Sequence, residues 1–426
     1  MKTGLLVSTL ILSCMLLNSC IFTDLASDIE EYDELISVSG KIIPTPKKDG
    51  PVVIVLWPVE DTETTSGNYW LMEKPGSFGF KIPEGKFHLI AYQDINHDAT
   101  YQKNEPVGIC VEPQVFSSKA GQSYTNIEIT LGPYDESALP ESLISSIGAD
   151  NSKYYEERIS FLGEVLALDD PIYSEENVNR GYWTPYSFYS DFGFKVSFLE
   201  EYDPERIPIL FVHGAKGFPE NFSAIIQNLD HDKFQAWVAY YPSGASLELL
   251  GKHLKQSLLE LNLQYGFDEI ILVAHSMGGL VTRRALIADE SDEGKHSFNV
   301  PLFVSIATPW NGHASAKDGV TKAPAVVPSW FEMVPDNPFI KNLFSHPLPE
   351  KTRFIMFFSF DNDKLISFES DHTDGAVTLA TQLHIPAQDD AERIIGIDST
   401  HVGILSDPVT LEKLNLLLEG EALLLK

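Results

Sequence analysis

The sequence predicts a small all-β sandwich followed by a mostly parallel β-sheet that is covered by helices on both faces. From residue 207 onward, apolar runs without alternation, such as 209–212, 236–240 and 270–274, are separated by helical patterns. Such runs are typical of parallel strands buried on both faces. Before residue 132, short β-rich runs alternate with turn residues at a spacing typical of a sandwich.

These patterns divide the 426 residues into consecutive segments. The expected order is a signal peptide (1–19), a solvated acidic tether (20–35), the sandwich (36–133), a connecting segment packed on the next domain (134–205) and the sheet domain (206–426). Residues 313–351 are rich in apolar side chains between two expected strands. They are either a candidate lid over an acyl pocket or a plainly packed insertion.

The first twenty residues have the features of an export signal. Lys2 precedes an apolar run, residues 5–17, that is too short to span a bilayer comfortably. The run ends in Leu17-Asn18-Ser19-Cys20, which resembles a bacterial lipobox. The resemblance implies cleavage before Cys20 and a stable lipid anchor on its thiol. Ile21, in place of aspartate after the cysteine, implies a destination in the outer membrane of a Gram-negative cell envelope. The alternative to a lipoprotein signal is an ordinary signal peptide with a chance cysteine.

The charge and the cysteines exclude several classes of function. Asp and Glu number 61 against 30 Lys and Arg, so the formal net charge is −31 and we expect nucleic acid to be repelled. Of the three cysteines, Cys14 leaves with the signal and Cys20 is acylated, so Cys110 has no partner. We therefore expect neither an internal disulfide nor a metal site built on thiolates.

One serine stands where an expected strand changes into an expected helix. Residues 270–274 form an apolar run, Ser276 follows in His275-Ser276-Met277-Gly278, and a helical pattern continues to about residue 288. Such a turn strains the serine backbone, and the residues two before and two after it must be small. Ala274 and Gly278 meet this demand, although the usual motif has glycine at the first of these positions.

A second motif, Val212-His213-Gly214-Ala215, ends an earlier apolar run. With the serine turn it resembles the α/β-hydrolase fold, bacterial lipases and esterases in particular, over residues 207 to about 420. GPI-inositol-deacylase-like acylesterases share both motifs. The resemblance implies that the backbone N–H groups of Ala215 and Met277 form an oxyanion hole, which stabilises the charge that develops during acyl transfer.

A serine hydroxyl needs a base to act as a nucleophile. In this fold an acid and then a histidine follow the serine along the chain. His401 follows the last expected strand, and Asp374, in an Asp-Gly-Ala-Val sequence that resembles the Asp-Gly-x-Val of bacterial lipases, is the preferred acid. Asp361 and Asp363 are the alternatives. In this interpretation Ser276 attacks, His401 transfers the proton, and Asp374 orients and stabilises the imidazole.

These residues predict a serine hydrolase of carboxylic esters, lipase- or esterase-like, that works through an acyl-enzyme. The expected substrate is an acyl ester or a lipid, and the chemistry requires no cofactor. Amidase and thioesterase chemistry use the same residues. A membrane-anchored binding protein with an inactive hydrolase fold is the alternative from another class, and the complete Ser–acid–His set argues against it. His213 and His275 are expected to be structural.

The predicted sandwich resembles carboxypeptidase-regulatory or transthyretin-like domains in residues 76–80 and 85–92. A loop within it has oxygen-bearing side chains at positions 1, 3, 5 and 12 of a calcium loop. These are Asp94, Asn96, Asp98 and Glu105. Ala99 stands where the loop needs glycine and no helices flank it, so a calcium site competes here with an ordinary hairpin rich in Asp and Asn.

Overall fold

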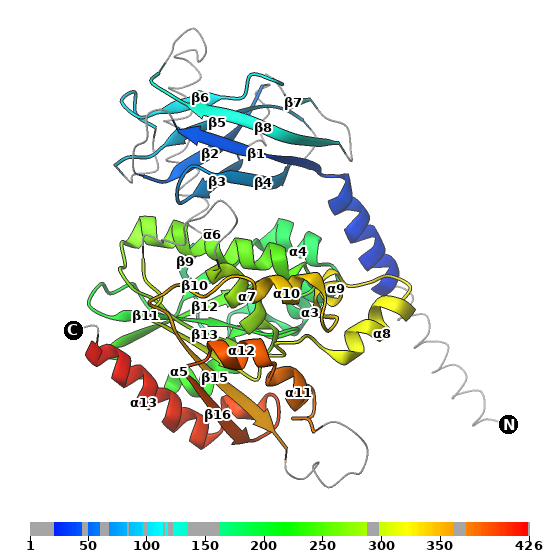
Figure 1. Ribbon diagram of the computed structural model, residues 1–426, viewed down its shortest axis with the longest axis vertical. Coiled ribbons are helices and arrows are strands. Elements are labelled where there is room, and N and C mark those ends of the chain that lie inside the picture. The colour runs from blue at the N-terminus through cyan, green and yellow to red at the C-terminus, as the bar shows by residue number, and fades with distance from the viewer. Residues whose placement is uncertain are drawn as a thin grey trace, which may run out of the picture.

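The structure, a computed structural model, has an all-β domain above an α/β domain in the view of Figure 1. It describes residues 21–44, 50–59, 68–82, 85–96, 101–113, 116–117, 122–134, 162–287, 298–361 and 372–424. The expected signal peptide, Cys20, Asp98 and Asp363 lie outside these residues.

In the described part of the chain, strands β1 to β8 form the all-β domain. One sheet has the order β4-β1-β8 and the other the order β3-β2-β5-β6, with β7 paired to β5. Alternate side chains of both sheets, such as Val38, Ile54 and Ile129, meet in one buried core. The strand bounds are β1 (Ile36–Pro44), β2 (Val52–Pro58), β3 (Asn68–Met72), β4 (Ser77–Ile82), β5 (Lys86–Gln93), β6 (Val107–Ile109), β7 (Phe116–Ser117) and β8 (Ser123–Leu131).

The second domain is built on a sheet of order β16-β15-β14-β13-β11-β12-β10-β9. β10 runs antiparallel to β12, while the other neighbouring pairs are parallel. This confirms the mostly parallel sheet predicted from the apolar runs. The strand bounds are β9 (Leu162–Val165), β10 (Lys195–Phe198), β11 (Ile207–Val212), β12 (Phe234–Tyr240), β13 (Ile271–His275), β14 (Leu302–Ile306), β15 (Arg353–Phe360) and β16 (Arg393–Asp398).

Helices cover both faces of this sheet (Figure 1). Short 3₁₀ helices occupy Pro171–Tyr173, Pro219–Phe222 and Gly403–Leu405. The α-helices are α3 (Glu175–Trp183), α4 (Pro185–Phe192), α5 (Ser223–Gln227), α6 (Leu247–Tyr265), α7 (Met277–Leu286), α8 (Ala314–Lys322), α9 (Pro328–Met333), α10 (Pro338–Leu343), α11 (Leu379–Gln382), α12 (Ile385–Asp390) and α13 (Pro408–Leu424).

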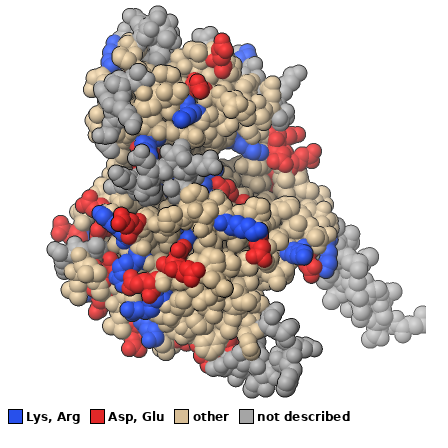
Figure 2. Space-filling view, in the orientation of Figure 1, with Lys and Arg blue, Asp and Glu red and all other residues tan. Residues whose placement is uncertain are grey.

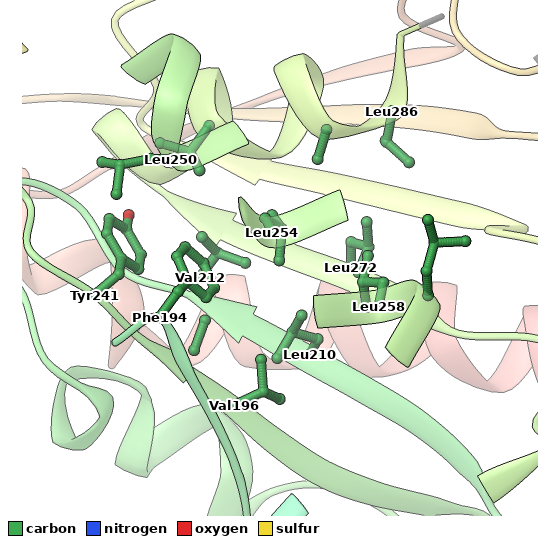
Figure 3. Close-up of a cluster of buried hydrophobic side chains, with 14 of the residues drawn as sticks. Phe194, Val196, Leu210, Val212, Tyr241, Leu250, Leu254, Leu258, Leu272 and Leu286 are labelled. Carbon is green, nitrogen blue, oxygen red and sulfur yellow. The ribbon is translucent and has the colours of Figure 1, made fainter. Parts of the chain in front are cut away.

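The alternation of β11 explains why its sequence is apolar throughout. Leu210 and Val212 point to one face, where they pack with Leu250 and Leu254 of α6 (Figure 3). Ile209 and Phe211 belong to the core on the other face, which also contains residues of α5 and α13. Because both faces are buried, no position in the strand is left for a polar side chain.

Helix α6 follows the predicted leucine spacing. Leu250, Leu254 and Leu258 are buried on one side of it. The helix ends at Gly266, which has φ +65° and is therefore in the left-handed conformation that glycine adopts without strain.

Residues 162–205, expected to be part of a connecting segment, belong to the second domain. They supply β9, α3, α4 and β10 to the second domain, and β10 pairs with β12 from Lys195↔Tyr240 to Phe198↔Trp237. The sheet domain therefore begins before residue 206, because two of its strands come from the segment that was expected only to pack against it.

Residues 21–34 form a helix, in contrast to the solvated tether expected from their acidic composition. Leu25 and Asp28 are buried. The Asp28 carboxylate accepts hydrogen bonds from the backbone N–H groups of Tyr186 (2.9 Å) and Ser187 (2.7 Å) in the first turn of α4. An acidic side chain is stabilised there because these amides lack partners within the helix. The acidic segment is thus docked by one of its own carboxylates.

Acidic and basic side chains are interspersed on the face shown in Figure 2. Cys110 is buried and reduced. Within the described ranges, no helix is both long and apolar enough to span a membrane.

Candidate active site

Ser276 lies at the junction of β13 and α7, in the strained turn that the sequence predicts. Its backbone has φ 54° and ψ −132°, a conformation that non-glycine residues rarely adopt. The Ser276 N–H donates to the carbonyl oxygen of Ile306 (2.8 Å), and the Ser276 carbonyl accepts from the N–H of Gly279 (3.0 Å). These bonds hold the side chain at the carboxyl edge of the sheet.

Two glycines allow this turn to fit against the end of β11. A Cβ on Gly278 would lie 2.4 Å from the carbonyl oxygens of both Val212 and His213. A Cβ on Gly214 would lie 2.6 Å from that of Ser276. The two loops therefore touch through backbone atoms, and β11 and β13 pair in register up to Val212↔Ala274.

The structure brings Ser276, His401 and Asp374 into one hydrogen-bonded row. His401 Nε2 lies 2.9 Å from Ser276 Oγ, and His401 Nδ1 lies 2.7 Å from Asp374 Oδ2. These residues follow β13, β16 and β15, whose carboxyl ends meet at the same edge of the sheet. Of the candidate acids, Asp374 is the one that the structure places within hydrogen-bond distance of His401 Nδ1, and the described alternative Asp361 lies directly after β15.

Asp374 is fully buried, yet it is built to stay ionised. Its Oδ1 accepts from the N–H groups of Ala376 (2.9 Å) and Val377 (2.7 Å), and its Oδ2 accepts from Ser359 Oγ (2.6 Å) and Gln382 Nε2 (3.1 Å). Burial alone would raise the pKa of Asp374, but the hydrogen bond and charge of His401 and these donors outweigh it, so the pKa lies below its usual range.

Sequence reasoning missed the roles of Ser359 and Gln382. Ser359 lies near the end of the apolar strand β15, and Gln382 lies at the end of the short helix α11. Both are buried polar residues, and Gln382 also accepts from the Ser359 N–H (2.9 Å). The polar Ser359 inside an apolar strand was the one signal in the sequence, but that signal does not show that its hydroxyl donates to Asp374.

The candidate oxyanion donors belong to the two loops beside Ser276. Met277 is the first residue of α7, so its N–H has no partner within the helix and points along the positive end of the helix dipole. Ala215 lies in the turn after β11 and is exposed. The neighbouring Lys216 has φ 51°, and its N–H donates to Ser243 Oγ (2.9 Å), which holds the turn in place.

His213 and His275 are both buried and both bond to main-chain carbonyls. The His213 ring stacks on Tyr241 at 4.1 Å and its Nδ1–H donates to Gly214 O (2.8 Å). His275 Nε2–H donates to the His401 carbonyl (2.8 Å). Burial lowers the pKa of His213 to about 4, and burial together with His401 lowers that of His275 to about 3. Both rings are therefore neutral supports for the loops of the site.

The candidate lid, residues 313–351, folds into α8, α9 and α10 and is fastened to the rest of the domain. His313 Nε2–H donates to Ala376 O (2.7 Å), the Ser329 N–H to Gly244 O (2.9 Å), and Arg283 Nε–H to Leu343 O (2.7 Å). Its movement over an acyl pocket stays a prediction.

In the candidate calcium loop, the Glu105 carboxylate is bound by backbone N–H groups of the loop. Glu105 is buried, and its two carboxylate oxygens accept from the N–H groups of Ile95 (2.7 Å) and Gln102 (2.9 Å). No group of three or more His, Cys, Asp or Glu residues in the described ranges could hold a metal ion. Since Asp98 lies outside those ranges, calcium at this loop stays a prediction.

The strand order and the serine turn identify the second domain. A mostly parallel sheet carries a strained serine after β13, with an acid after β15 and a histidine after β16. The second domain has the α/β-hydrolase fold. Its fold thus agrees with the resemblance seen in the motifs.

Comparisons with known proteins give similarities to lipases and esterases. Residues 247–389 of the hydrolase domain match the family model described as lecithin:cholesterol acyltransferase. No curated protein sequence matches the chain.

Solved structures similar to this chain include three bacterial and archaeal proteins. The mature Bacillus licheniformis lipase BlEst2 has 21% identity and a TM-score of 0.41, covering 51% of this chain and 94% of its own. The product of the Listeria innocua gene lin2722 has 17% identity and a TM-score of 0.39, covering 50% and 94%. The Pyrococcus furiosus esterase Pf2001 has 16% identity and a TM-score of 0.34, covering 52% and 82%.

Proposed function

We propose that the protein is a serine hydrolase that cleaves carboxylic esters in the manner of a lipase or esterase. The observation that carries this proposal is the row of contacts from Ser276 Oγ to His401 Nε2 (2.9 Å) and from His401 Nδ1 to Asp374 Oδ2 (2.7 Å). It gives a weak hydroxyl nucleophile a base within hydrogen-bond distance, and gives that base an ionised partner. The match of residues 247–389 to an acyltransferase family model supports acyl chemistry.

The proposed reaction has two halves. Ser276 Oγ attacks the acyl carbon while His401 Nε2 takes its proton, and the resulting oxyanion is held by the N–H groups of Ala215 and Met277. His401 then gives the proton to the leaving alkoxide, and an acyl-enzyme ester remains on Ser276. Water attacks this ester with His401 again as the base, which releases the acid and restores the serine. Asp374 keeps the Nδ1 proton in place throughout.

The proposed setting is the bacterial cell envelope. The lipobox-like sequence ending at Cys20 supports acylation of this cysteine, and Ile21 supports an outer-membrane destination. Substrates with an apolar acyl group are supported by the apolar side chains of residues 313–351. The chemistry requires no cofactor, because the charge and proton transfers are assigned to side chains and backbone amides.

Hydrolysis of a series of 4-nitrophenyl acyl esters of increasing chain length tests this function. We expect the wild type to release nitrophenol and Ser276→Ala to lose kcat on the order of 10⁵- to 10⁶-fold. Ser406→Ala is the matched control, because this serine is exposed in the loop after His401 and bonds only to Gly403 among the described side-chain contacts. It should keep full activity. Equal rates for Ser276→Ala and wild type would refute the assignment, and a wild type inactive on esters, thioesters and amides would favour the binding protein.

A further inference from the structure

The N-terminal helix, residues 21–34, starts one peptide bond after Cys20 and is fixed at its beginning to the hydrolase domain. The Phe22 ring packs edge-on against Trp183 of α3 at 5.7 Å between centroids. Further along, Tyr32 stacks on Tyr186 of α4 at 3.6 Å. Since adjacent Cα atoms are about 3.8 Å apart, acyl chains on Cys20 would leave the protein beside Phe22.

Helix 21–34 is also fastened to the all-β domain. Lys81 of β4 lies over the Tyr32 ring at 3.9 Å and donates to the Tyr32 carbonyl at 2.8 Å. With the bonds from Asp28 to α4, these contacts hold the helix against both domains. The helix that follows Cys20 in the sequence is therefore fixed by the fold and is not a loose tether.

The contacts of Phe22 continue to the candidate oxyanion turn. Trp183 packs edge-on against Trp330 of α9 at 6.1 Å, and Trp330 Nε1–H donates to Tyr182 Oη at 2.6 Å. Lys216 Nζ lies 4.8 Å from the Tyr182 ring centroid and 5.1 Å from that of Trp183. Lys216 directly follows Ala215. The partly buried rings of Phe22, Tyr182, Trp183 and Trp330 therefore form an aromatic rim beside the active site.

Two large apolar side chains beside this site face the solvent. Phe331, next to Trp330 of the rim, is 54% exposed, and Val402, next to the candidate base His401, is 59% exposed. Each is the sequence neighbour of a residue at the rim or the site, and exposed apolar side chains at a functional site indicate a surface that contacts something apolar. Figure 1 shows the start of the N-terminal helix beside α8 and α9, on the same side of the molecule.

We propose that the aromatic rim with Phe331 and Val402 is a membrane-contact surface, and that helix 21–34 holds the active site against the leaflet that carries the acyl chains of Cys20. The substrate is then an acyl lipid taken from that leaflet. This inference rests on the proposed ester hydrolysis and on acylation of Cys20.

The chemistry of the surface fits a bilayer. Tryptophan and tyrosine rings concentrate at the level of the lipid headgroups, and a lysine beside them keeps its ammonium in water while its methylenes stay apolar. A protein of net charge −31 is repelled by anionic headgroups, so electrostatic attraction cannot bring it to the membrane. In this proposal, apolar contacts of the rim and the covalent lipid on Cys20 hold the protein at the membrane.

Fluorescence of the acylated full-length protein in vesicles of phosphatidylethanolamine and phosphatidylcholine tests the contact. A nitrobenzoxadiazole label is placed on Phe331→Cys or Val402→Cys, with the unsubstituted protein as background for Cys110. Leu416→Cys is the control, because Leu416 is 63% exposed on α13, which packs on the opposite face of the sheet from α6 and α7. We expect brominated acyl chains to quench the labels at 331 and 402 several-fold more than at 416. Equal quenching at the three positions, or none, would overturn the proposal.

A flexible Gly-Ser linker inserted between Cys20 and Ile21 tests the role of the anchor. We expect hydrolysis of vesicle lipid to fall several-fold because the effective concentration of the site at the leaflet falls, while hydrolysis of a soluble short-chain ester is unchanged. If the short ester is cleaved but the linker does not slow lipid hydrolysis, this inference fails and the proposed function stands. If neither substrate is cleaved by any form, the proposed function fails. A mass spectrum without acyl chains on Cys20 also overturns the inference.

Discussion

The carboxyl edge of the hydrolase sheet and the loop of residues 94–105 in the all-β domain both carry acidic side chains, but their contacts are made over very different distances in sequence. Ser276 and His401 are 125 residues apart in sequence and lie 2.9 Å apart. In the loop, Glu105 and Ile95 are 10 residues apart, yet the Glu105 carboxylate binds backbone amides. Parallel strands bring distant residues to one edge, whereas closeness in sequence alone does not make a site.

The two buried carboxylates differ in how the backbone uses them. Both backbone amides that bond to Asp374 donate to Oδ1, whereas Oδ2 accepts from the side chains of Ser359, Gln382 and His401. In Glu105 each oxygen accepts one backbone amide, Oε1 from Ile95 and Oε2 from Gln102. A buried carboxylate can thus accept from backbone amides on one oxygen and from side chains, a functional one included, on the other.

After Ser276, replacing Asp374 should have the largest effect on catalysis. We expect Asp374→Asn to reduce kcat on the order of 10⁴-fold, because an amide does not hold the His401 Nδ1 proton or stabilise the charged ring. Asp361→Asn is the control and should stay near wild type. Steady-state kinetics on a short acyl ester would measure both, and the reverse order of effects would mean that Asp361 is the acid.

The buried histidines of the hydrolase domain predict a pH dependence of stability. The pKa values of His213 and His275 are lowered to about 4 and 3, so below the ordinary histidine pKa of about 6.5 the unfolded chain binds protons that the folded chain does not. The free energy of unfolding should therefore fall as pH drops from about 6.5 to 4, by up to about 1.4 kcal/mol per pH unit for each histidine. Denaturant titrations at several pH values measure this slope. His275→Asn should reduce it, and an unchanged slope would contradict the assignment.

The close approach of the two backbone loops at Ser276 predicts a steric effect. Gly278→Ala should lower the free energy of unfolding by about 1–3 kcal/mol, because its Cβ would lie 2.4 Å from two carbonyl oxygens. Esterase activity should fall with it. Gly420 on α13 has no atom within 4 Å of a built Cβ, so Gly420→Ala should be neutral or slightly stabilising. Equal thermal midpoints for the two variants would show that the loops can separate freely.

Replacing Glu105 should weaken the all-β domain and leave catalysis intact. Glu105→Gln turns one of two buried acceptor oxygens into an NH₂ group that faces a backbone N–H, which costs about 1–3 kcal/mol of stability. Thermal unfolding should shift downward while kcat stays at the wild-type value. Unchanged stability would mean that the carboxylate is not needed to hold the loop.

Calcium should have the smallest effect. Because the Glu105 oxygens are already bound to amides, we expect no heat of binding in titration calorimetry at millimolar calcium. Measurable heat that disappears in Asp94→Asn would establish the loop as a calcium site.

Much of the hydrolase fold and its site could be predicted because the patterns that indicate them involve residues close together in the sequence. The apolar run of β13, followed by Ser276 and Gly278, predicts the strained turn. The uniformly apolar sequence of β11 indicates that this strand is buried on both faces. Ser359 and Gln382 could not be predicted in the same way, because their roles depend on contacts with Asp374 made across 15 and 8 residues of chain.

The N-terminal helix was missed for a related reason. Its acidic composition favours a solvated segment, but Asp28 caps α4 from 158 residues away and Tyr32 stacks on Tyr186. These partners are visible only after the chain has folded. The same holds for β10, which pairs with β12, and for β9, which pairs with β10.

If the fold activates Ser276 as a nucleophile, a fluorophosphonate should label this serine. The account predicts one phosphonyl adduct per wild-type protein by intact mass, located on Ser276 by peptide mapping, and none on Ser276→Ala. Asp374→Asn should label far more slowly than wild type. An adduct on another residue, or none on a folded wild-type protein in the presence of a detergent that opens residues 313–351, would contradict the account.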